Sequence, residues 1–448
     1  MRESALQPPR VYIHTLGCPK NEADSRSLGR ALAAAGARVV DAPDLASHIL
    51  INTCGFIREA KEESIAAILE ICAAYRDLQV FVAGCLVERY RAELVAGIPE
   101  VAGWFGLLTG PEREVLLRVL AQNEKAVPER PTGEARLSSG ALTNRPPYAY
   151  LKISDGCDGP CTFCAIPGIK GSYQPLSVGE IWGEAQACLA EGARELVLVG
   201  QDTACWQSDG LDLTGLIDLL AGDERVSWIR VMYLQPDHVT EHFLRYMACQ
   251  PKLCRYLDIP FQHSHPYILR RMGRAGDATL YLELLAEARR LAPDVALRSA
   301  FIVGFPGETE EHFAHLLEFV QQAEFDYAGG FIYSPEEGTV AARLRPRVRQ
   351  REARNRLNRL QAVLLESGEA ARRGLVGRSV EVMIDELGTE DGGDEFAAVA
   401  RSRGQAPEVD GVTYIEGELP PEVGVGDVVK VRIEAVVGYD LVGRCDVS

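Results

Sequence analysis

Two sets of three cysteines have a spacing that could do chemistry in this chain of 448 residues. The first set is compact, because the stretch 157-CDGPCTFC-164 carries Cys157, Cys161 and Cys164. Three thiolates from one short loop can hold three irons of a cubane iron–sulfur cluster and leave the fourth iron open to a small molecule. A structural zinc site is the alternative, but such sites usually have four protein ligands, and no fourth cysteine or histidine lies nearby. Three unrelated buried cysteines would also be possible, although the neighbouring glycines indicate a loop rather than a core segment.

The second set is dispersed along the first hundred residues. Cys18, Cys54 and Cys85 each follow directly after a run typical of a strand, namely VYIHTLG, HILINT and VFVAG. The carboxyl ends of parallel strands meet at one edge of a sheet, so we expect these three thiols to converge on a second cluster site. Any one of them alone would more often be a buried cysteine. The other six cysteines show no ligand-like pattern, and we interpret them as ordinary core or surface residues: Cys72, Cys188, Cys205, Cys249, Cys254 and Cys445.

The sequence pattern places the chain in the α/β class and divides it into three domains. Strands and helices alternate over residues 10–125, which predicts a doubly wound parallel sheet. A polar stretch rich in Pro, Gly and Ser over 121–147 is typical of a linker. Residues 143–373 contain six candidate strands with helices between several of them, which predicts a partial (β/α)6 barrel. Short glycine-punctuated strands over 374–446 predict a small antiparallel β-barrel.

The composition is that of a globular protein, with 47% hydrophobic and 25% charged residues. No apolar run is long enough to span a membrane, and the start MRESALQPPR lacks the apolar region of a secretion signal. We therefore expect a cytoplasmic location without a membrane partner. In that reducing compartment, metal binding or burial is a better explanation of the cysteines than disulfide bonds.

The compact triplet resembles the radical S-adenosylmethionine (SAM) superfamily. The resemblance is carried by the C-x3-C-x2-C spacing, by Phe163 before the third cysteine, and by the position directly after the first barrel strand. It implies that a 4Fe–4S cluster binds SAM through its open iron and splits it to a 5′-deoxyadenosyl radical.

Contacts to SAM are expected at the carboxyl ends of the barrel strands. Phe163 would shield the cluster. The remaining candidates lie after the second and fourth strands and on or after the fifth: Gly200, Gln201, Asp202, Gln262, Arg298, Gly304 and Glu308. A turn or a structural salt bridge is an equally good explanation for each of these residues.

The three domains together resemble the methylthiotransferases, with a C-terminal module that looks like a TRAM domain. Two motifs, 17-GCPKNEADS-25 and 333-YSPEEGT-339, resemble the RimO branch, which acts on ribosomal protein S12. The tRNA-modifying MiaB branch usually has Gln-Met in place of Pro19-Lys20 and Arg-Pro in place of Glu336-Glu337. The segment 301-FIVGFPGETEE-311 is common to both branches. The stretch Asp158–Pro160 departs from the family pattern, which more often has Asn and basic residues at these positions, and the departure leaves the three cysteines unchanged.

The resemblance implies an enzyme with two 4Fe–4S clusters. One generates the radical that removes hydrogen from the β-carbon of an aspartate in ribosomal protein S12, and the Cys18/Cys54/Cys85 cluster delivers a methylthio group. An electron donor such as flavodoxin would be required. The alternatives are methylthiolation of a modified adenosine in tRNA and a non-catalytic iron–sulfur or RNA-binding sensor.

Charge provides a separate physical argument about the partner. The chain has a formal net charge of −17, and residues 379–448 hold 16 acidic and 5 basic side chains. Such a domain would repel RNA phosphates and suits a basic protein, although an acidic surface can also serve solubility alone. The arginine-rich stretch 343–359 has the opposite charge. It could contact ribosomal RNA, or it could be a solvated helix face.

Overall fold

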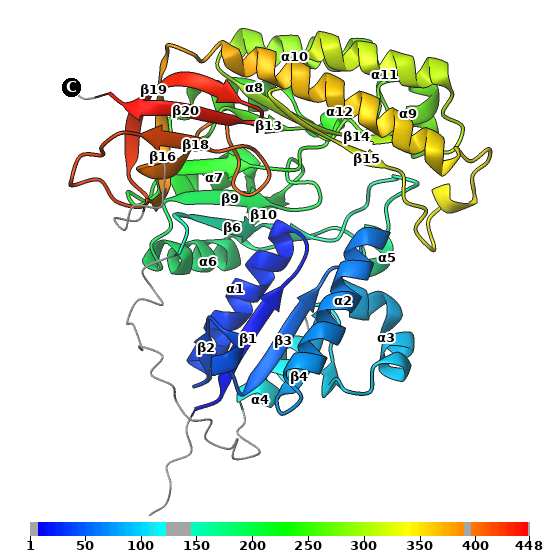
Figure 1. Cartoon of the computed structure of the whole chain (residues 1–448), viewed down its shortest axis with the longest axis vertical. Coiled ribbons are helices and arrows are strands. Elements are labelled where there is room, and N and C mark those ends of the chain that lie inside the picture. The colour runs from blue at the N-terminus through cyan, green and yellow to red at the C-terminus, as the bar shows by residue number, and fades with distance from the viewer. Residues whose placement is uncertain (1–7, 110, 122–144, 389–395, 447–448) are drawn as a thin grey trace, which may run out of the picture. The chain divides into compact units, whose positions relative to one another are not determined.

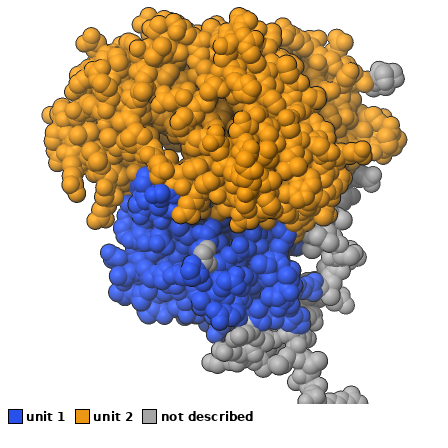
Figure 2. Space-filling model, turned by 180° about the vertical axis from the view of Figure 1, so that it is seen from behind, with its two compact units in different colours: residues 1–144, 165–172 blue, residues 145–164, 173–448 orange. Residues whose placement is uncertain are grey.

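The computed structural model describes residues 8–109, 111–121, 145–388 and 396–446. The expected linker falls almost entirely outside these ranges. The chain forms two compact units, which are coloured separately in Figure 2. Unit 1 comprises residues 1–144 and 165–172, and unit 2 comprises residues 145–164 and 173–448. No helix in the described part of the chain is long and apolar enough to cross a bilayer.

Unit 1 is built on a parallel five-stranded sheet in the order β2-β1-β3-β4-β5, which confirms the predicted doubly wound domain (Figure 1). Helices α1 and α4 bury apolar side chains on one face, and α2 and α3 do so on the other. A further short helix, α5, belongs to this unit although it follows the compact cysteine triplet in sequence. The elements are β1 (Arg10–Thr15), α1 (Pro19–Ala34), β2 (Arg38–Val40), β3 (His48–Thr53), α2 (Arg58–Ala74), β4 (Gln79–Gly84), α3 (Cys85–Gly97), β5 (Gly103–Trp104), α4 (Pro111–Ala121) and α5 (Ile166–Lys170).

Helix α1 starts five residues before the position expected from the sequence, where a helix over 24–36 is predicted. The reason is local, because Pro19 occupies the first helical position and Cys18 is the N-cap residue. Proline suits this position because its missing N–H would have no helical partner there. The early start places Cys18 at the very end of the loop after β1.

Unit 2 begins with a partial barrel of six parallel strands, which confirms the (β/α)6 prediction. The strands form two runs, β6-β9-β12 and β13-β14-β15. Leu234 N–H donates to the Asp258 carbonyl at 2.9 Å across the boundary between the runs. The elements are β6 (Tyr148–Lys152), β7 (Ser154–Asp155), β8 (Gln174–Pro175), α6 (Val178–Ala190), β9 (Glu195–Val199), β10 (Gln207–Ser208), β11 (Leu211–Asp212), α7 (Leu213–Ala221), β12 (Trp228–Val231), α8 (Glu241–Cys249), β13 (Tyr256–Asp258), α9 (Pro266–Met272), α10 (Ala278–Leu291), β14 (Ala296–Val303), α11 (Glu310–Ala323), β15 (Tyr327–Ile332) and α12 (Gln350–Arg373).

The C-terminal strands close into the small barrel that the sequence predicts, in the order β16-β17-β18-β20-β19. One pair, β18 with β20, is parallel rather than antiparallel. After β18 the chain passes to the other side of the barrel, where β19 pairs with β16. It then turns back as β20, which lies between β19 and β18 and runs parallel to β18. The strands are β16 (Ser379–Leu387), β17 (Ala398–Ser402), β18 (Thr413–Glu416), β19 (Val428–Val437) and β20 (Asp440–Cys445).

The small barrel packs against the amino ends of the large barrel's strands (Figure 1). Glu195, the first residue of β9, binds Arg401 of β17 at 2.7 Å. Tyr256, the first residue of β13, donates to Asp410 at 2.6 Å. The compact cysteine loop follows the carboxyl end of β6, so the small barrel closes the end of the large barrel away from that loop.

Candidate functional site

The dispersed cysteines converge in unit 1, as the sequence predicts. Cys18, Cys54 and Cys85 follow β1, β3 and β4, which are neighbours in the sheet. A Cβ on Gly17 would lie 2.5 Å from Cys54 Cβ, and Gly17 has a φ of +97°. A Cβ on Gly55 would lie 2.7 Å from the backbone of Leu86, the residue after Cys85. Only glycine therefore allows these three loops to approach so closely.

Buried amide side chains fix the first two of these loops. Asn21 donates to the Leu16 carbonyl at 2.8 Å and to the Thr53 carbonyl at 3.2 Å. Asn52 donates in turn to the Asn21 carbonyl at 3.1 Å. These bonds join the end of β1 to the end of β3 and fix the loops that carry Cys18 and Cys54.

Burial keeps two of these thiols protonated in the metal-free protein. Burial raises the pKa of Cys54, and it raises the pKa of Cys85 to about 12. Lys170 opposes the shift at Cys85, and its own buried ammonium lies 3.9 Å from Asp24. A metal that binds here must displace thiol protons, and Lys170 provides positive charge that favours the thiolate.

The compact triplet lies in unit 2 on a loop bound to the end of α9 and to the chain before α12. Thr162 N–H donates to the Met272 carbonyl, and Ala341 N–H donates to the Thr162 carbonyl, both at 2.9 Å. Gly273 has a φ of +73°, and a Cβ there would lie 2.2 Å from the Pro160 carbonyl oxygen. These contacts hold the loop against the end of α9.

Two groups act directly on thiols of the compact triplet. Gly159 N–H donates to Cys157 Sγ at 3.3 Å. An Nη1 of the buried Arg274 lies 4.0 Å from Cys161 Sγ. Burial raises the pKa of Cys161, and Arg274 acts against that shift. Both contacts would stabilise negative charge on sulfur, which is what a thiolate-held cluster needs.

Neither triplet has the spacing of a single-ion site. A tetrahedral zinc with Zn–S bonds of about 2.3 Å holds its sulfurs roughly 3.8 Å apart. Among the described residues, one trio has its ligand atoms within 4.8 Å of one another, namely Asp202, Cys205 and His238, and it includes neither triplet. A donor set of three sulfurs suits an iron–sulfur cluster, whereas a structural zinc usually takes four protein ligands.

Two of the expected SAM contacts present unsatisfied polar atoms at the carboxyl end of β9. Both amide atoms of Gln201 and Oδ1 of the buried Asp202 lack a hydrogen-bond partner among the described residues. Asp202 Oδ2 lies 2.6 Å from His238 Nδ1. A Cβ on Gly200 would lie 2.5 Å from Ser154 Oγ, close to the start of the cysteine loop. Buried polar atoms without partners are costly, so these fit a site that a polar ligand completes.

The other expected SAM contacts have structural partners. Arg298 binds Asp258 at 2.8 Å and Asp410 at 3.3 Å, near the end of the barrel that the small barrel closes. Glu308 is buried with Arg356 at 3.2 Å and also accepts from the Gly304 N–H. These contacts favour the salt-bridge explanation for Arg298 and Glu308, and a turn for Gly304, whose φ is +74°.

Gln262 and Phe163 are also positioned by neighbouring structure. Gln262 has a φ of +68°, and its backbone pairs with β14 through Ala300 and Ile302, both at 2.8 Å. Phe163 packs edge-on against Phe305 with ring centroids 6.5 Å apart. Their roles toward SAM stay predictions.

Sequence reasoning missed several polar residues of these sites. Arg274, Gln235, His238 and Lys170 all lie within or beside them, but none belongs to a short motif. Gln235 and His238 follow the carboxyl end of β12, the third barrel strand, so their position is the same signal that marks Gln201 after the second strand. Arg274 and Lys170 carry no comparable local signal.

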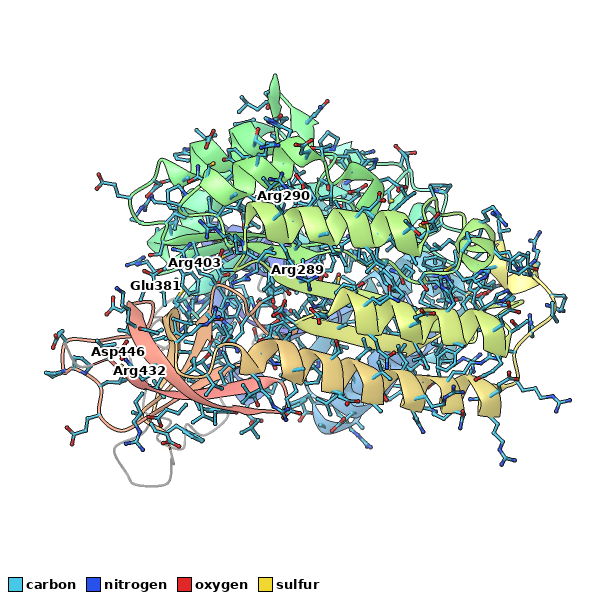
Figure 3. All side chains as sticks on the ribbon, turned by 90° about the horizontal axis from the view of Figure 1, so that it is seen from above. Arg289, Arg290, Glu381, Arg403, Arg432 and Asp446 are labelled. Atoms are coloured by element: carbon cyan, nitrogen blue, oxygen red, sulfur yellow. The ribbon has the colours of Figure 1, made fainter. Side chains whose placement is uncertain are left out.

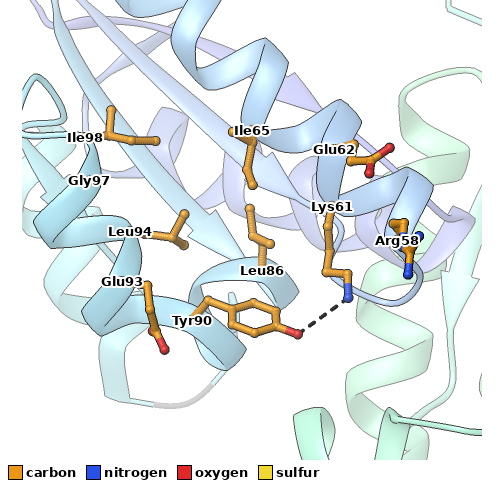
Figure 4. A pocket seen from close by; sticks show the side chains of 10 residues that line it. All are labelled: Arg58, Lys61, Glu62, Ile65, Leu86, Tyr90, Glu93, Leu94, Gly97 and Ile98. Atoms are coloured by element: carbon orange, nitrogen blue, oxygen red, sulfur yellow. Dashed lines mark hydrogen bonds between the residues drawn. The ribbon is translucent and has the colours of Figure 1, made fainter. Parts of the chain in front are cut away.

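A separate pocket of about 460 Å³ lies between α2 and α3 of unit 1 (Figure 4). Its floor is apolar, and the Lys61 ammonium lies 3.5 Å from the Tyr90 hydroxyl at its edge. No expected site residue lines it; the lining residues are Arg58, Lys61, Glu62, Ile65, Leu86, Tyr90, Glu93, Leu94, Gly97 and Ile98.

Family models match three parts of the chain. Residues 10–106 match the uncharacterized protein family UPF0004, residues 151–320 match the radical SAM superfamily, and residues 376–445 match the TRAM domain. Among solved structures, the radical SAM methyltransferase TsrM from Kitasatospora setae, with cobalamin and a 4Fe–4S cluster bound, has a TM-score of 0.54 at 16% identity. That match covers 74% of this chain and 77% of the other, and it shows a shared fold alone.

Curated relatives match the chain over nearly its full length. The ribosomal protein uS12 methylthiotransferase RimO of Moorella thermoacetica is 39% identical over 97% of this chain and 99% of its own length. RimO of Anaeromyxobacter sp. strain K is 40% identical over 97% and 93% respectively. RimO of Thermotoga maritima is 38% identical over 97% and 99%. With the radical SAM fold and both triplets in place, this chain belongs to the RimO family of radical SAM methylthiotransferases.

Proposed function

We propose that this chain adds a methylthio group to the β-carbon of an aspartate in ribosomal protein uS12. It would use SAM and two 4Fe–4S clusters, one on each cysteine triplet. One observation carries the proposal: a radical SAM chain of this family has a second set of three thiols, which converge at the edge of a separate sheet. A single cluster would suffice for radical generation, so the second set indicates a second chemical task.

The residues divide between these two tasks. When bound, a cluster on the compact loop supplies the electron that cleaves SAM, and one on the dispersed triplet carries the sulfur to be transferred. Arg274 and the Gly159 N–H stabilise charge on the compact triplet. Gln201 and Asp202 offer the unsatisfied atoms that would bind polar groups of SAM or of the substrate. Phe163 and its apolar neighbours keep water from one side of the loop.

The choice of a protein substrate over tRNA is supported by the small barrel as well as by the names of the relatives. Its exposed and half-buried arginines are bound to acidic groups. Arg403 lies 3.4 Å from Glu381, and Arg432 lies 3.5 Å from Asp446 (Figure 3). Arg444 lies 3.1 Å from Glu416. An acidic domain whose arginines are already paired has little to offer RNA phosphates.

The proposal includes a low-potential electron donor of the flavodoxin kind and a cytoplasmic place of action, where ribosomal proteins are found. The acidic small barrel suits a basic protein surface. Since this barrel lies at the end of the large barrel away from the cysteine loop, it would bind the partner at a distance from the reacting aspartate.

The test is mass spectrometry of both possible substrates after reaction with the anaerobically reconstituted chain. We expect uS12 in small ribosomal subunits to gain one methylthio group in place of a hydrogen, on one aspartate, and tRNA to stay unchanged. Modified tRNA with unmodified uS12 would contradict the substrate assignment. Intact clusters without 5′-deoxyadenosine production would indicate the non-catalytic sensor instead.

Variants of the two triplets separate their roles. Cys157→Ala should abolish reductive cleavage of SAM. Cys85→Ala should keep that cleavage and lose methylthio transfer. Cys249→Ala, an exposed cysteine outside both sets, is the matched control and should retain both activities. Retention of SAM cleavage by Cys157→Ala would refute the assignment of the compact loop.

A further inference from the structure

An exposed basic surface lies on the segment that leads into α12. Residues 343–354 contain six arginines and one glutamate, in a chain whose formal net charge is −17. All six arginine side chains are exposed. We call this surface the arginine rim; its members are Arg343, Arg345, Arg347, Arg349, Arg351 and Arg354.

The arginine rim has no acidic partners among the residues that the structure describes. Within residues 8–109, 111–121, 145–388 and 396–446, no carboxylate forms an ion pair with any of these six guanidinium groups. The next two arginines along the chain differ, because Arg356 binds Glu308 at 3.2 Å and Arg359 binds Glu310 at 2.6 Å. Crowded like charges repel one another, so the rim contributes little to the stability of the chain itself.

The backbone beneath the rim is fixed in place. Leu344 packs against the apolar cluster of Ile268 and Phe305. Arg271 donates to the Arg345 carbonyl, and Gly307 N–H donates to the Pro346 carbonyl, both at 2.8 Å. A preorganised backbone lowers the entropy lost when a partner binds.

The rim lies beside the compact cysteine loop. Ala341, two residues before Arg343, donates its N–H to the carbonyl of Thr162, which lies between Cys161 and Cys164. Helix α12 then runs for 24 residues, about 36 Å, back toward the small barrel (Figure 1). The rim is therefore at the reactive end of the large barrel, whereas the acidic small barrel covers the other end.

We propose that the arginine rim binds phosphates of ribosomal RNA next to the substrate loop of uS12; this rests on the proposed function. Guanidinium forks bind phosphate oxygens bidentately and stay charged at any physiological pH. A ribosomal protein is surrounded by RNA in the assembled subunit, so an enzyme that reaches it there meets phosphates at the edge of its active site. The RNA contact would thus come from the rim, not from the TRAM domain.

The test compares two variants of the reconstituted full chain, each with four substitutions. The rim variant carries Arg343→Gln, Arg347→Gln, Arg349→Gln and Arg351→Gln. The matched control carries Arg225→Gln, Arg245→Gln, Arg255→Gln and Arg290→Gln, which remove the same charge from exposed ion pairs on the large barrel. Binding is measured to small ribosomal subunits and to RNA extracted from them, over a series of salt concentrations, and separately to free uS12.

We expect the rim variant to bind both ligands about tenfold or more weakly near physiological salt. Its slope of log Kd against log salt should fall by about 1 for each arginine that contacts a phosphate. The control should bind like the unmodified chain, and both variants should cleave SAM at the unmodified rate.

Three results would overturn the inference: undiminished binding by the rim variant, equal losses in both variants, or a loss of binding to free uS12 without RNA. The last would indicate an acidic or polar protein surface as the partner. Rim-dependent RNA binding without modification of uS12 would instead refute the proposed substrate and leave the rim assignment standing. If the rim variant modified uS12 as well as the unmodified chain does, the rim assignment would be refuted and the proposed substrate would stand.

Discussion

The guanidinium of Arg274 lies 4.0 Å from Cys161 Sγ and also donates to the Gln235 side-chain carbonyl. Arg274 is 9% exposed, so its charge acts in a medium of low polarity. An N–H directed at a ligand sulfur, together with a nearby positive charge, stabilises the more negative state of an iron–sulfur cluster and raises its reduction potential. The residue therefore favours electron uptake by a cluster on the compact loop.

We predict that Arg274→Gln lowers the reduction potential of that cluster by on the order of tens of millivolts. The measurement is a redox titration of the reconstituted chain followed by electron paramagnetic resonance. Arg270→Gln, an exposed arginine near the end of α9, should leave the potential unchanged. An unaltered potential in Arg274→Gln would show that the contact only shapes the loop.

Gly17 provides a test of the dispersed triplet. Gly17→Ala would place a Cβ 2.5 Å from Cys54 Cβ, in a backbone conformation that disfavours side chains. We predict that this variant loses the cluster of unit 1 and keeps the one on the compact loop. Iron and sulfide per chain should then fall to about half, since one of the two proposed clusters is lost.

Gly36→Ala is the control that separates the close contact with Cys54 from the strain of the backbone conformation. Gly36 has a φ of +90°, close to that of Gly17, but nothing lies within 4 Å of its added Cβ. Both substitutions carry strain of about 1 kcal/mol or more. If both variants lost iron equally, strain rather than the approach to Cys54 would be responsible.

The positions of both triplets in the fold could be predicted from sequence because their signals are local. Cys18, Cys54 and Cys85 follow apolar strands, and parallel strands bring such ends together whatever the rest of the chain does. The compact triplet is a single short motif. The partial barrel and the small barrel followed from strand patterns of the same kind. The early start of α1 depends on Pro19 at the first helical position, which the pattern over 24–36 does not include.

The polar surroundings could not be predicted because their partners are distant in sequence. Arg274 is 113 residues from Cys161, and Arg298 is 112 residues from Asp410. A polar residue on or after a barrel strand can face the end of the barrel that carries the cysteine loop, or it can form a structural ion pair. The sequence does not distinguish these two outcomes. Neither amide atom of Gln201 has a partner among the described residues, whereas Arg298 and Glu308 form salt bridges, with Glu308 Oε1 still unsatisfied.

Glu195 connects the two barrels of unit 2 from a fully buried position. It accepts from Arg230 Nε and Arg401 Nη1, both at 2.7 Å. Burial alone would raise the pKa of Glu195, but Arg230 and Arg401 outweigh it and lower that pKa. Glu195→Gln would leave two buried cations without their shared anion, which typically costs about 3–5 kcal/mol.

We predict a lower melting temperature for Glu195→Gln and faster proteolysis at the junction of the two barrels. Glu241→Gln is the control, because its pair with Arg245 is exposed and should be worth less than about 1 kcal/mol. Equal stability of the two variants would mean that the small barrel is held by its apolar contacts alone.

His265 should make the stability of unit 2 depend on pH. Burial lowers the pKa of His265 to about 4, and the neighbouring His312, His315 and His263 act in the same direction, opposed by Glu311. Its ring lies 4.3 Å from that of His312 and 5.0 Å from that of His315. Its Nδ1 accepts from the Tyr267 N–H at the start of α9, so the neutral ring caps that helix.

The direction of the effect follows from the two protonation states. The unfolded chain protonates His265 near 6.5 and the folded chain only near 4, so the unfolded state binds more protons between these values. Stability should fall as the pH drops from 6.5 toward 4 and level off below. His265→Asn, which keeps an acceptor suited to the helix cap, should flatten this dependence in thermal melts between pH 7 and pH 4.5. His242→Asn, at an exposed position on α8, should leave the slope unchanged. A slope unaffected by His265→Asn would assign the dependence to the other histidines of the group.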